Sequence, residues 1–205
     1  MTTTISRLYN SPVEAQEAVR SLEAAGLSHS DISIMASNAD NWYDSTGRKH
    51  DKDNDGVDDR AEGAGKGAGI GAVLGGGAGL LAGLGLIAIP GVGPVVAAGW
   101  LAATAAGALA GGATGGIIGA LTEAGVSRED ADVYAEGIRR GGALVTARVP
   151  DGERSRYEAV MDRAAVNVRQ RGDLYRKSGW TGYNPSAAPY TADQVRAERD
   201  SYISR

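Results

Sequence analysis

The sequence contains no cysteine, only two histidines, and no charged residue between positions 67 and 122. The absence of cysteine excludes disulfide bonds, thiol catalysis and cysteine-ligated zinc or iron–sulfur centres. The formal net charge of −4 gives no electrostatic reason to expect a nucleic-acid partner. The N-terminal residues Met1–Thr4 are polar and lead directly into a strand pattern, so we expect no signal peptide.

Residues that an enzyme would need are also scarce. His29 lies in a Leu-Ser-His-Ser turn and His50 stands beside an acidic segment, and we interpret both side chains as solvent-exposed. The glycine-rich segment 63–69 lacks the Gly-Lys-Ser/Thr ending of a phosphate-binding loop and does not follow a strand. We therefore expect a non-enzymatic protein with no small-molecule substrate.

The chain does contain a long uncharged stretch, residues 67–122, which holds more than half of its 31 glycines. Glycines recur at every fourth position in each half, so in helices they would share one face, where two backbones can approach closely. Pro90 and Pro94 stand where one helix would end and the next would begin. The pattern predicts a glycine-zipper α-helical hairpin with helices over 67–89 and 95–121. The predicted self-association positions are Gly71, Gly75, Gly79, Gly107, Gly111 and Gly115.

The glycine spacing leaves the environment of this hairpin open. At about 1.5 Å per residue the two helices would reach roughly 34 and 40 Å, and a bilayer hydrocarbon core is about 30 Å thick. The hairpin could span a membrane, associate reversibly with lipid, or stay in water within a homo-oligomer that shields its apolar side chains. Trp100 would be either an interfacial anchor or an ordinary packing residue. We favour a homo-oligomer associated with the inner membrane, its other domain in the cytoplasm; the alternative is a cytoplasmic protein.

The segment Asp51–Glu62 matches a twelve-residue calcium loop. It has carboxylates at loop positions 1, 3, 5 and 9, glycine at 6 and glutamate at 12, a spacing that supplies the oxygen ligands Ca²⁺ prefers. The predicted ligands are Asp51, Asp53, Asp55, Asp59, Glu62 and the carbonyl of Val57. Asp58 occupies a position that is usually apolar, and no convincing helix precedes the loop. A solvated acidic linker is therefore the alternative interpretation.

The remaining residues alternate between strand and helix patterns. Ser11-Pro12-Val13-Glu14 is a typical helix start, and Ser127 is a second N-cap. Strands are predicted over 3–9, 31–36, 143–149 and 165–169, and helices over 12–25, 127–140 and 151–165. Apart from the insert and its exit helix, the order is β-α-β, β-α-β. Right-handed crossovers then predict an α+β fold, a ferredoxin-like sandwich of a four-stranded antiparallel sheet with two helices on one face.

This interpretation divides the chain into five parts. Residues 1–36 are the first half of the ferredoxin-like domain, and residues 127–171 are the exit helix and the second half. Residues 37–66 are a polar and acidic linker with the calcium loop, and residues 67–122 are the hairpin. Residues 172–205 are a C-terminal tail with a short helix from Ala192, which we expect to be partly disordered or packed on a neighbouring subunit.

Three segments outside the insert point to a known family. They are Tyr-Asn-Ser-Pro-Val-Glu-Ala at 9–15, Asp-Ile-Ser-Ile at 31–34, and Tyr-Ala-Glu-Gly-Ile-Arg-Arg-Gly-Gly-Ala-Leu-Val at 134–145. Their combination resembles the bacterial general stress protein 17M-like (heat-induced stress protein) domain, in a longer version with a glycine-zipper insert. The resemblance covers the two halves of the folded part and implies a stress-associated bacterial protein with no catalytic residues to transfer.

Together these patterns predict a non-enzymatic bacterial stress-response protein that self-assembles and associates with a membrane through its glycine-zipper hairpin. The alternative is a soluble, calcium-responsive oligomeric binding module.

Calcium binding is testable by isothermal titration calorimetry of the full chain. If Asp51–Glu62 is a calcium loop, the wild-type protein should bind Ca²⁺ with measurable heat. The Asp55→Ala variant, which removes the carboxylate at loop position 5, should weaken that binding by at least about tenfold. The absence of binding heat in the wild-type protein would establish the acidic-linker interpretation instead.

Overall fold

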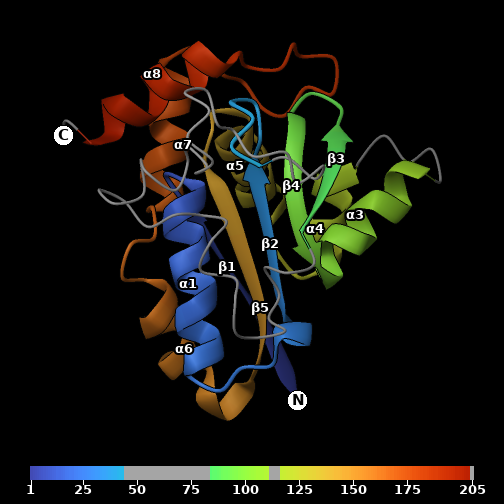
Figure 1. Ribbon diagram of the computed structural model, residues 1–205, viewed down its shortest axis with the longest axis vertical. Helices are drawn as coiled ribbons and strands as arrows, with labels where there is room; N and C mark the ends of the chain where they lie inside the picture. The colour runs from blue at the N-terminus through green and yellow to red at the C-terminus, as the bar shows by residue number, and fades with distance from the viewer. Residues whose placement is uncertain (44–83, 111–115, 204–205) are drawn as a thin grey trace, which may run out of the picture.

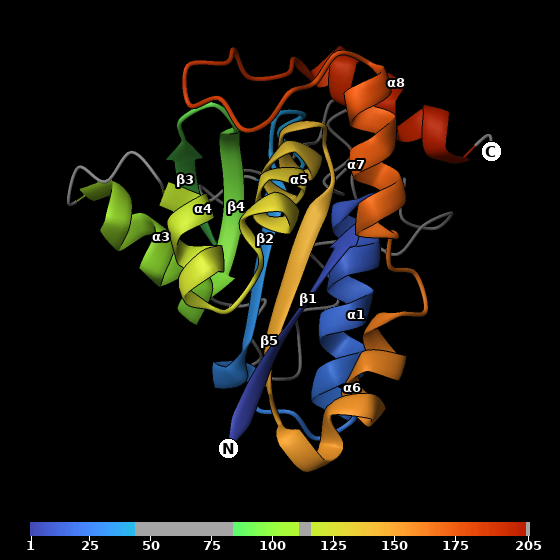
Figure 2. The same cartoon turned by 180° about the vertical axis from the view of Figure 1, so that it is seen from behind.

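The computed structural model describes residues 1–43, 84–110 and 116–203 (Figure 1). Among these residues, one five-stranded antiparallel sheet has the strand order β1-β5-β2-β4-β3. Helices α1 and α6 cover one face of the sheet, and α3, α4 and α5 lie on the other (Figures 1 and 2). The expected combination of helices with an antiparallel sheet is therefore confirmed.

Residues 2–37 fold as their pattern predicts. Strand β1 (Thr2–Tyr9) is followed by α1 (Pro12–Ala24), a 3-10 turn η1 (His29–Asp31) and strand β2 (Ile32–Ser37). The hydroxyl of Ser11 accepts a hydrogen bond from the backbone N–H of Glu14 at 3.3 Å. The Glu14 carboxylate accepts one from the backbone N–H of Asn10 at 2.9 Å, so two of the N–H groups at the helix start are satisfied.

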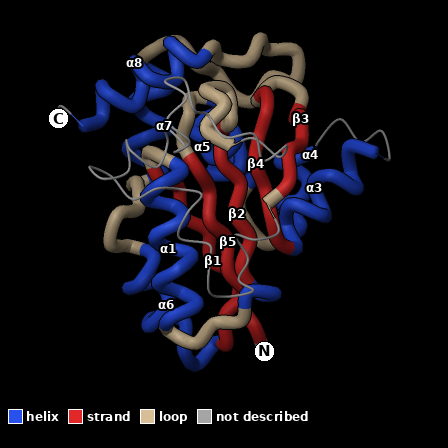
Figure 3. The backbone as a smooth tube through the Cα atoms, viewed as in Figure 1, coloured by secondary structure: helices blue, strands red, loops and turns tan. Residues whose placement is uncertain are grey.

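The central strand comes from the second half of the chain. Helix α5 (Arg128–Arg139), capped by Ser127, leads into β5 (Ala143–Pro150), which pairs with β1 on one side and β2 on the other. Figure 3 shows these three strands side by side at the middle of the molecule. The second half of the domain is thus inserted between the two strands of the first half.

The predicted helical hairpin is wrong over the residues on both sides of its turn. Residues Gly85–Ile89 form strand β3 and Gly93–Gly99 form strand β4, joined by a tight turn in which the Val92 N–H donates to the Ile89 carbonyl at 3.0 Å. Because β4 pairs with β2, these residues extend the sheet. Glycine has low intrinsic helix propensity, so a partner strand decides the conformation of such a segment.

Helical structure in this region begins only at Trp100. Helix α3 (Trp100–Ala110) packs against the sheet, and helix α4 (Gly116–Glu123) packs against α3 and α5. Gly99, with a φ of 90°, makes the sharp change from strand to helix. The part of the predicted first helix over 67–83 lies outside the described residues.

The alternation of side chains along the strands produces two cores. Towards α1 and α6 the main buried side chains are Ile5, Tyr9, Val19, Leu22, Ile34, Val145 and Met161. Towards α3, α4 and α5 they are Leu8, Met35, Val95, Leu101, Ile117, Leu121, Ile138 and Leu144. The central strands β2 and β5 contribute to both cores, as expected when both faces of a sheet are covered.

Two predictions for the end of the domain need correction. Asp151 does not cap a helix; its carboxylate accepts a hydrogen bond from the Thr3 hydroxyl at 2.5 Å, and a 3-10 turn η5 (Asp151–Glu153) precedes α6 (Arg154–Met161). The strand expected over 165–169 is only a single bridge between Leu8 and Val166. It is short because Asn167 already caps the next helix, α7 (Val168–Lys177).

The C-terminal part packs on the body of its own chain. After α7, an extended segment crosses the ends of β4 and β3 and returns to α8 (Ala192–Ile203), as the red ribbon shows in Figures 1 and 2. The Tyr183 hydroxyl donates to the Pro90 carbonyl at 2.6 Å, and Arg139 donates to the Ala188 carbonyl at 2.9 Å. The short helix from Ala192 is confirmed, and the expected partial disorder or packing on a neighbouring subunit stays a prediction.

The contact between this C-terminal segment and the β3–β4 turn is testable at Gly91. Its φ is 70°, and a Cβ there would overlap the carbonyl oxygen of Asn184 and come within 2.7 Å of the Pro185 Cα. We expect Gly91→Ala to lower the free energy of unfolding by about 2–4 kcal/mol, because left-handed strain and backbone overlap add together. The measurement is chemical denaturation followed by circular dichroism.

The matched control is Gly26→Ala. Gly26 also has a positive φ, 94°, but a Cβ there would meet no atom within 4 Å. It should therefore lose only about 1 kcal/mol, the cost of the left-handed conformation alone. Equal losses in the two variants would show that the C-terminal segment does not constrain the turn.

Candidate functional site

Most residues that the sequence pointed to lie outside the described part of the chain. This applies to His50, to the calcium-ligand set and to five of the six zipper glycines, namely Asp51, Asp53, Asp55, Val57, Asp59, Glu62, Gly71, Gly75, Gly79, Gly111 and Gly115. Gly107 is described: it is exposed on α3, and a Cβ there would meet no atom within 4 Å. Among the described residues, Gly107 is therefore not at a helix–helix contact.

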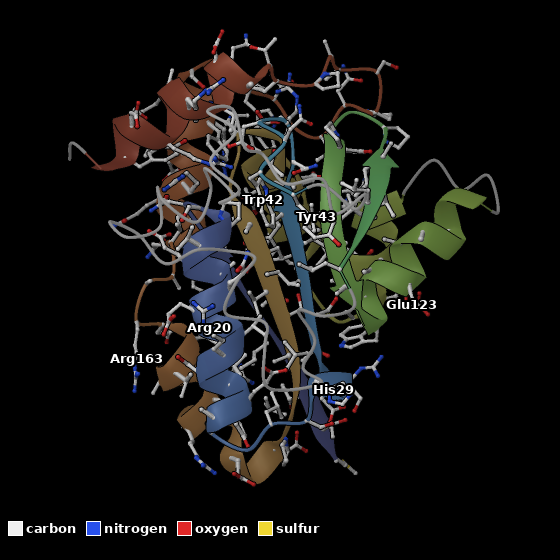
Figure 4. All side chains as sticks on the ribbon, viewed as in Figure 1. Arg20, His29, Trp42, Tyr43, Glu123 and Arg163 are labelled. Carbon is white, nitrogen blue, oxygen red and sulfur yellow. The ribbon has the colours of Figure 1, made fainter. Side chains whose placement is uncertain are left out.

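His29 and Trp100, which were also considered from the sequence, have simple surroundings. His29 is exposed in η1, at the end of the molecule where the N-terminus lies (Figure 4). Trp100 is half-buried at the start of α3, and the guanidinium of Arg148 lies 3.7 Å from the centre of its ring. This cation–π contact gives Trp100 a packing partner within the chain.

The described residues hold no cluster of three or more histidine, cysteine, aspartate or glutamate side chains suited to a metal ion. Among the same residues, no helix combines the length and apolar character needed to cross a bilayer.

An open pocket of about 490 Å³ lies at the outer edge of β1. It is lined by Arg7, Tyr134, Asp162, Ala165, Val166, Asn167, Val168 and Arg169. Arg7 donates to the Asp162 carboxylate at 2.5 Å and to the Ser6 carbonyl at 3.0 Å. The Tyr134 hydroxyl donates to the same Ser6 carbonyl at 3.1 Å. The polar groups of Arg7, Asp162 and Tyr134 are therefore engaged with the protein itself.

These contacts close part of the β1 edge. The carbonyls of Ser6 and Leu8 would otherwise be unpaired, and the second accepts from the Val166 N–H at 2.8 Å. Burial, aided by the nearby Asp130 carboxylate and opposed by Arg7, raises the pKa of the Tyr134 phenol to about 12. The phenol thus remains a neutral hydrogen-bond donor at physiological pH. An edge strand protected in this way cannot readily add another strand.

A charged network joins α5 to α8. Glu136 is only 5% exposed, and its carboxylate accepts from Arg140 at 2.6 Å. Arg140 also donates to Glu198 of α8 at 3.1 Å, and its guanidinium lies 4.3 Å from the centre of the Tyr175 ring. Burial alone would lower the pKa of Arg140, but the hydrogen bond and charge of Glu136 and the hydrogen bond to Glu198 outweigh it and raise the pKa. Removing one partner would leave a buried charge uncompensated.

A second part of this network reaches the loop after β2. Arg199 of α8 donates to the Asp40 carboxylate at 2.5 Å and to the Gly141 carbonyl at 2.8 Å. Arg171, 8% exposed, donates to the Asn10 side chain at 2.6 Å and stacks on Tyr202 of α8 at 3.7 Å. Helix α8 therefore fixes the loop from which residues 44–83 depart.

The two ends of the 44–83 segment meet on the body of the protein. The Tyr43 hydroxyl donates to the Leu84 carbonyl at 2.9 Å. The Asn38 side chain holds Tyr43 by accepting from its N–H and donating to its carbonyl, each at 3.0 Å. Trp42 packs edge-on against Tyr43 with ring centres 5.9 Å apart, and Figure 4 shows both side chains next to each other. The segment thus starts and ends at one fixed point.

Beyond the 44–83 segment the chain carries no charged residue as far as Thr122. We call β3, β4, α3 and the part of α4 up to Thr122 the uncharged side; its described residues are 84–110 and 116–122. These elements lie together on the right in Figure 1 and on the left in Figure 2. Leu86 is 44% exposed there, and Ala88, Ala103 and Gly107 are exposed. An exposed surface without charges is suited to contact with another protein or with lipid.

Sequence reasoning did not identify the pocket or the charged network. Arg7 and Asp162 are 155 positions apart, and Arg140 and Glu198 are 58 apart, so only the fold brings them together. One signal was visible: Glu136 and Arg140 stand four residues apart on the predicted exit helix, a spacing that permits an ion pair.

Tyr134 should make the stability of the protein sensitive to alkaline pH. Its folded pKa, about 12, is above the ordinary value of 10.0, so its contribution is complete below pH 10 and is lost as pH rises through 12. In urea denaturation, Tyr134→Phe should cost about 1 kcal/mol at pH 7. The free energy of unfolding of the wild type should fall by about 2–3 kcal/mol relative to the variant between pH 9 and pH 12, so that the variant becomes the more stable protein. Parallel pH curves would contradict this role.

Comparison with protein-family models, with curated proteins and with solved structures gave no match to this chain. Its function is therefore inferred from its residues, their arrangement and the resemblance described for its sequence.

Proposed function

We propose that this protein is a non-enzymatic, self-associating bacterial stress protein that presents an uncharged surface to other copies of itself and to membranes. The observation on which this depends is the fixed point at Tyr43 and Leu84. There the body holds both ends of a segment whose residues 67–83 are uncharged, and it does so beside the uncharged side. The body thus supplies a rigid base for an interaction surface.

The topology supports a ferredoxin-like domain as this base. The three strands β1, β5 and β2 are adjacent and antiparallel, α1 and α6 lie on the same face, and Val166 stands where a fourth strand would pair with β1. The β3–β4 hairpin would then be an addition to the β2 edge of that domain. The resembling segments at 9–15 and 31–34 lie in this base, and the one at 134–145 leads from α5 into its central strand β5, which supports the proposed stress association.

Self-association is supported by the exposed apolar and small residues of the uncharged side. Ala103 and Gly107 are exposed one helical turn apart on α3, so another helix or strand could approach closely there. We propose Gly107 as a contact between chains, together with Gly71, Gly75, Gly79, Gly111 and Gly115. Strands β3 and β4, which lie in the sequence between Gly79 and Gly107, would then be part of the body that presents these glycines.

For the membrane, we propose surface association rather than a hairpin that crosses the bilayer. Residues 85–99 belong to the sheet and are no longer free to enter lipid. A helix over the remaining residues, 67–83, would rise only roughly 25 Å, less than the hydrocarbon core of about 30 Å. The proposed location is thus the cytoplasmic surface of the inner membrane, with a cytoplasmic oligomer as the alternative.

The calcium-responsive module remains a second proposal. The carboxylate spacing of Asp51–Glu62 favours it, because it supplies the oxygen ligands that Ca²⁺ prefers. These residues belong to the segment that starts and ends at the fixed point. Ca²⁺ bound there would neutralise part of the acidic charge next to the uncharged residues.

Membrane association can be measured by flotation of the full chain with vesicles of phosphatidylethanolamine and phosphatidylglycerol. We expect the wild type to float with the vesicles and to be released by alkaline carbonate, because surface contacts do not span the bilayer. The double variant Leu80→Asp/Leu81→Asp should lose flotation at least about tenfold, since charges in the uncharged segment oppose burial in lipid.

The control is Leu174→Asp, which adds a charge at an exposed leucine of α7, away from the uncharged side. It should float like the wild type. If the wild type stays in solution, the membrane part of the proposal is wrong. If it floats but resists carbonate, a spanning arrangement replaces surface association.

A further inference from the structure

The outer edge of β3 has the properties of a strand that pairs with another strand. β3 pairs with β4 on one side, and no described strand pairs with it on the other. Its residues, Gly85 to Ile89, include no charge and no proline. Leu86 is 44% exposed and Ala88 is also exposed. Charges, prolines and covering segments are the usual means by which proteins prevent edge-to-edge pairing, and the described residues provide none of them here.

The backbone groups of this edge point outward at defined positions. Pro94 lies opposite Ala88 in the hairpin, and its carbonyl accepts from the Asn38 N–H at 2.8 Å, on the β2 side. The Ala88 backbone therefore does not bond to Pro94, and its N–H and C=O point away from β4. By the same alternation the Leu86 backbone also points outward. A new strand would find two donors and two acceptors there.

The opposite edge of the sheet shows the contrast. On β1, the outward carbonyl of Ser6 is covered by Arg7 and Tyr134, and that of Leu8 bonds to Val166. One edge is thus protected by specific side chains, and the other is left unpaired by the residues that the structure describes. This difference favours β3 over β1 as the edge at which the sheet is extended.

We propose that two copies of this chain pair their β3 strands antiparallel around a twofold axis at Ile87, so that the two sheets become one. The inference rests on the proposed self-association and names its interface. In this register Leu86 lies opposite the partner subunit's Ala88, and Gly85 lies opposite the partner subunit's Ile89. A large side chain meets a small one at each of these positions. Because the strand is uncharged, two copies meet without repulsion.

Helix α3 supplies the rest of the contact. It carries no charged residue and extends past β3 in both views (Figures 1 and 2), so in the pair it would lie over the partner's sheet. Its exposed small residues, Ala103 and Gly107, allow a close approach. This contribution is needed, since five paired residues alone bury less than the roughly 1,200 Å² of a stable interface.

The test is the solution mass of the full chain by sedimentation equilibrium. We expect the wild type to have twice the 21.0 kDa chain mass. Leu86→Lys/Ala88→Lys should weaken the pairing at least about tenfold, because the twofold axis places like charges opposite each other. Leu86→Glu/Ala88→Glu should do the same. Both positions are exposed, so far-UV circular dichroism should remain that of the wild type.

Mixing the two charged variants provides the decisive readout. Lysines on one strand opposite glutamates on the other should restore the pair, and no contact outside β3 would respond in this way. Leu174→Lys on α7 is the control and should leave the mass at twice that of the chain. A wild-type monomer would overturn both this inference and the proposed self-association. A wild-type pair unaffected by the lysine variant would overturn the β3 interface alone.

Discussion

The pairing of β4 with β2 determines most of the architecture. β2 would otherwise be an edge of the sheet, and its outward backbone groups would need another partner. Because β4 pairs there, a glycine- and valine-rich segment becomes part of the sheet and β3 forms the new edge. Helix α3 then begins directly after Gly99, the last residue of β4. It also places Leu84 next to Tyr43, which closes the 44–83 segment. The interaction surface considered above thus follows from a single strand pairing.

Elements that depend on local interactions could be predicted from the sequence, and elements that depend on pairing with a distant segment could not. The caps at Ser11 and Ser127 and the alternation in β1, β2 and β5 are local signals, and the corresponding elements form where they were expected. The sequence did not predict the β3–β4 hairpin, because glycines at every fourth position would share a helical face but do not show that a helix forms. Ile87 and Val95, which pair across the hairpin, are β-branched residues that favour strands. Most of the predicted metal and zipper residues lie outside the described ranges and remain predictions.

The candidate surfaces that sequence reasoning missed depend on contacts between distant segments. Nothing in the sequence near Arg140 indicates Glu198, and nothing near Arg199 indicates Asp40, because α8 reaches them only after the chain has crossed the end of the sheet. These buried ion pairs do not make the C-terminal helix strongly stabilising by themselves, since desolvation offsets much of their attraction. They favour one position for α8, because only there can Glu198 reach Arg140 and Arg199 reach Asp40.

The hydrogen bond between Tyr43 and Leu84 has a consequence for the evolution of the chain. Once the two ends of a segment are held together, the entropy of closing it grows only with the logarithm of its length. Doubling the length costs about 0.6 kcal/mol. Insertions or deletions of flexible residues between positions 43 and 84 would therefore change the stability of the body little. Selection can then vary that segment while the sheet and its C-terminal helix stay the same.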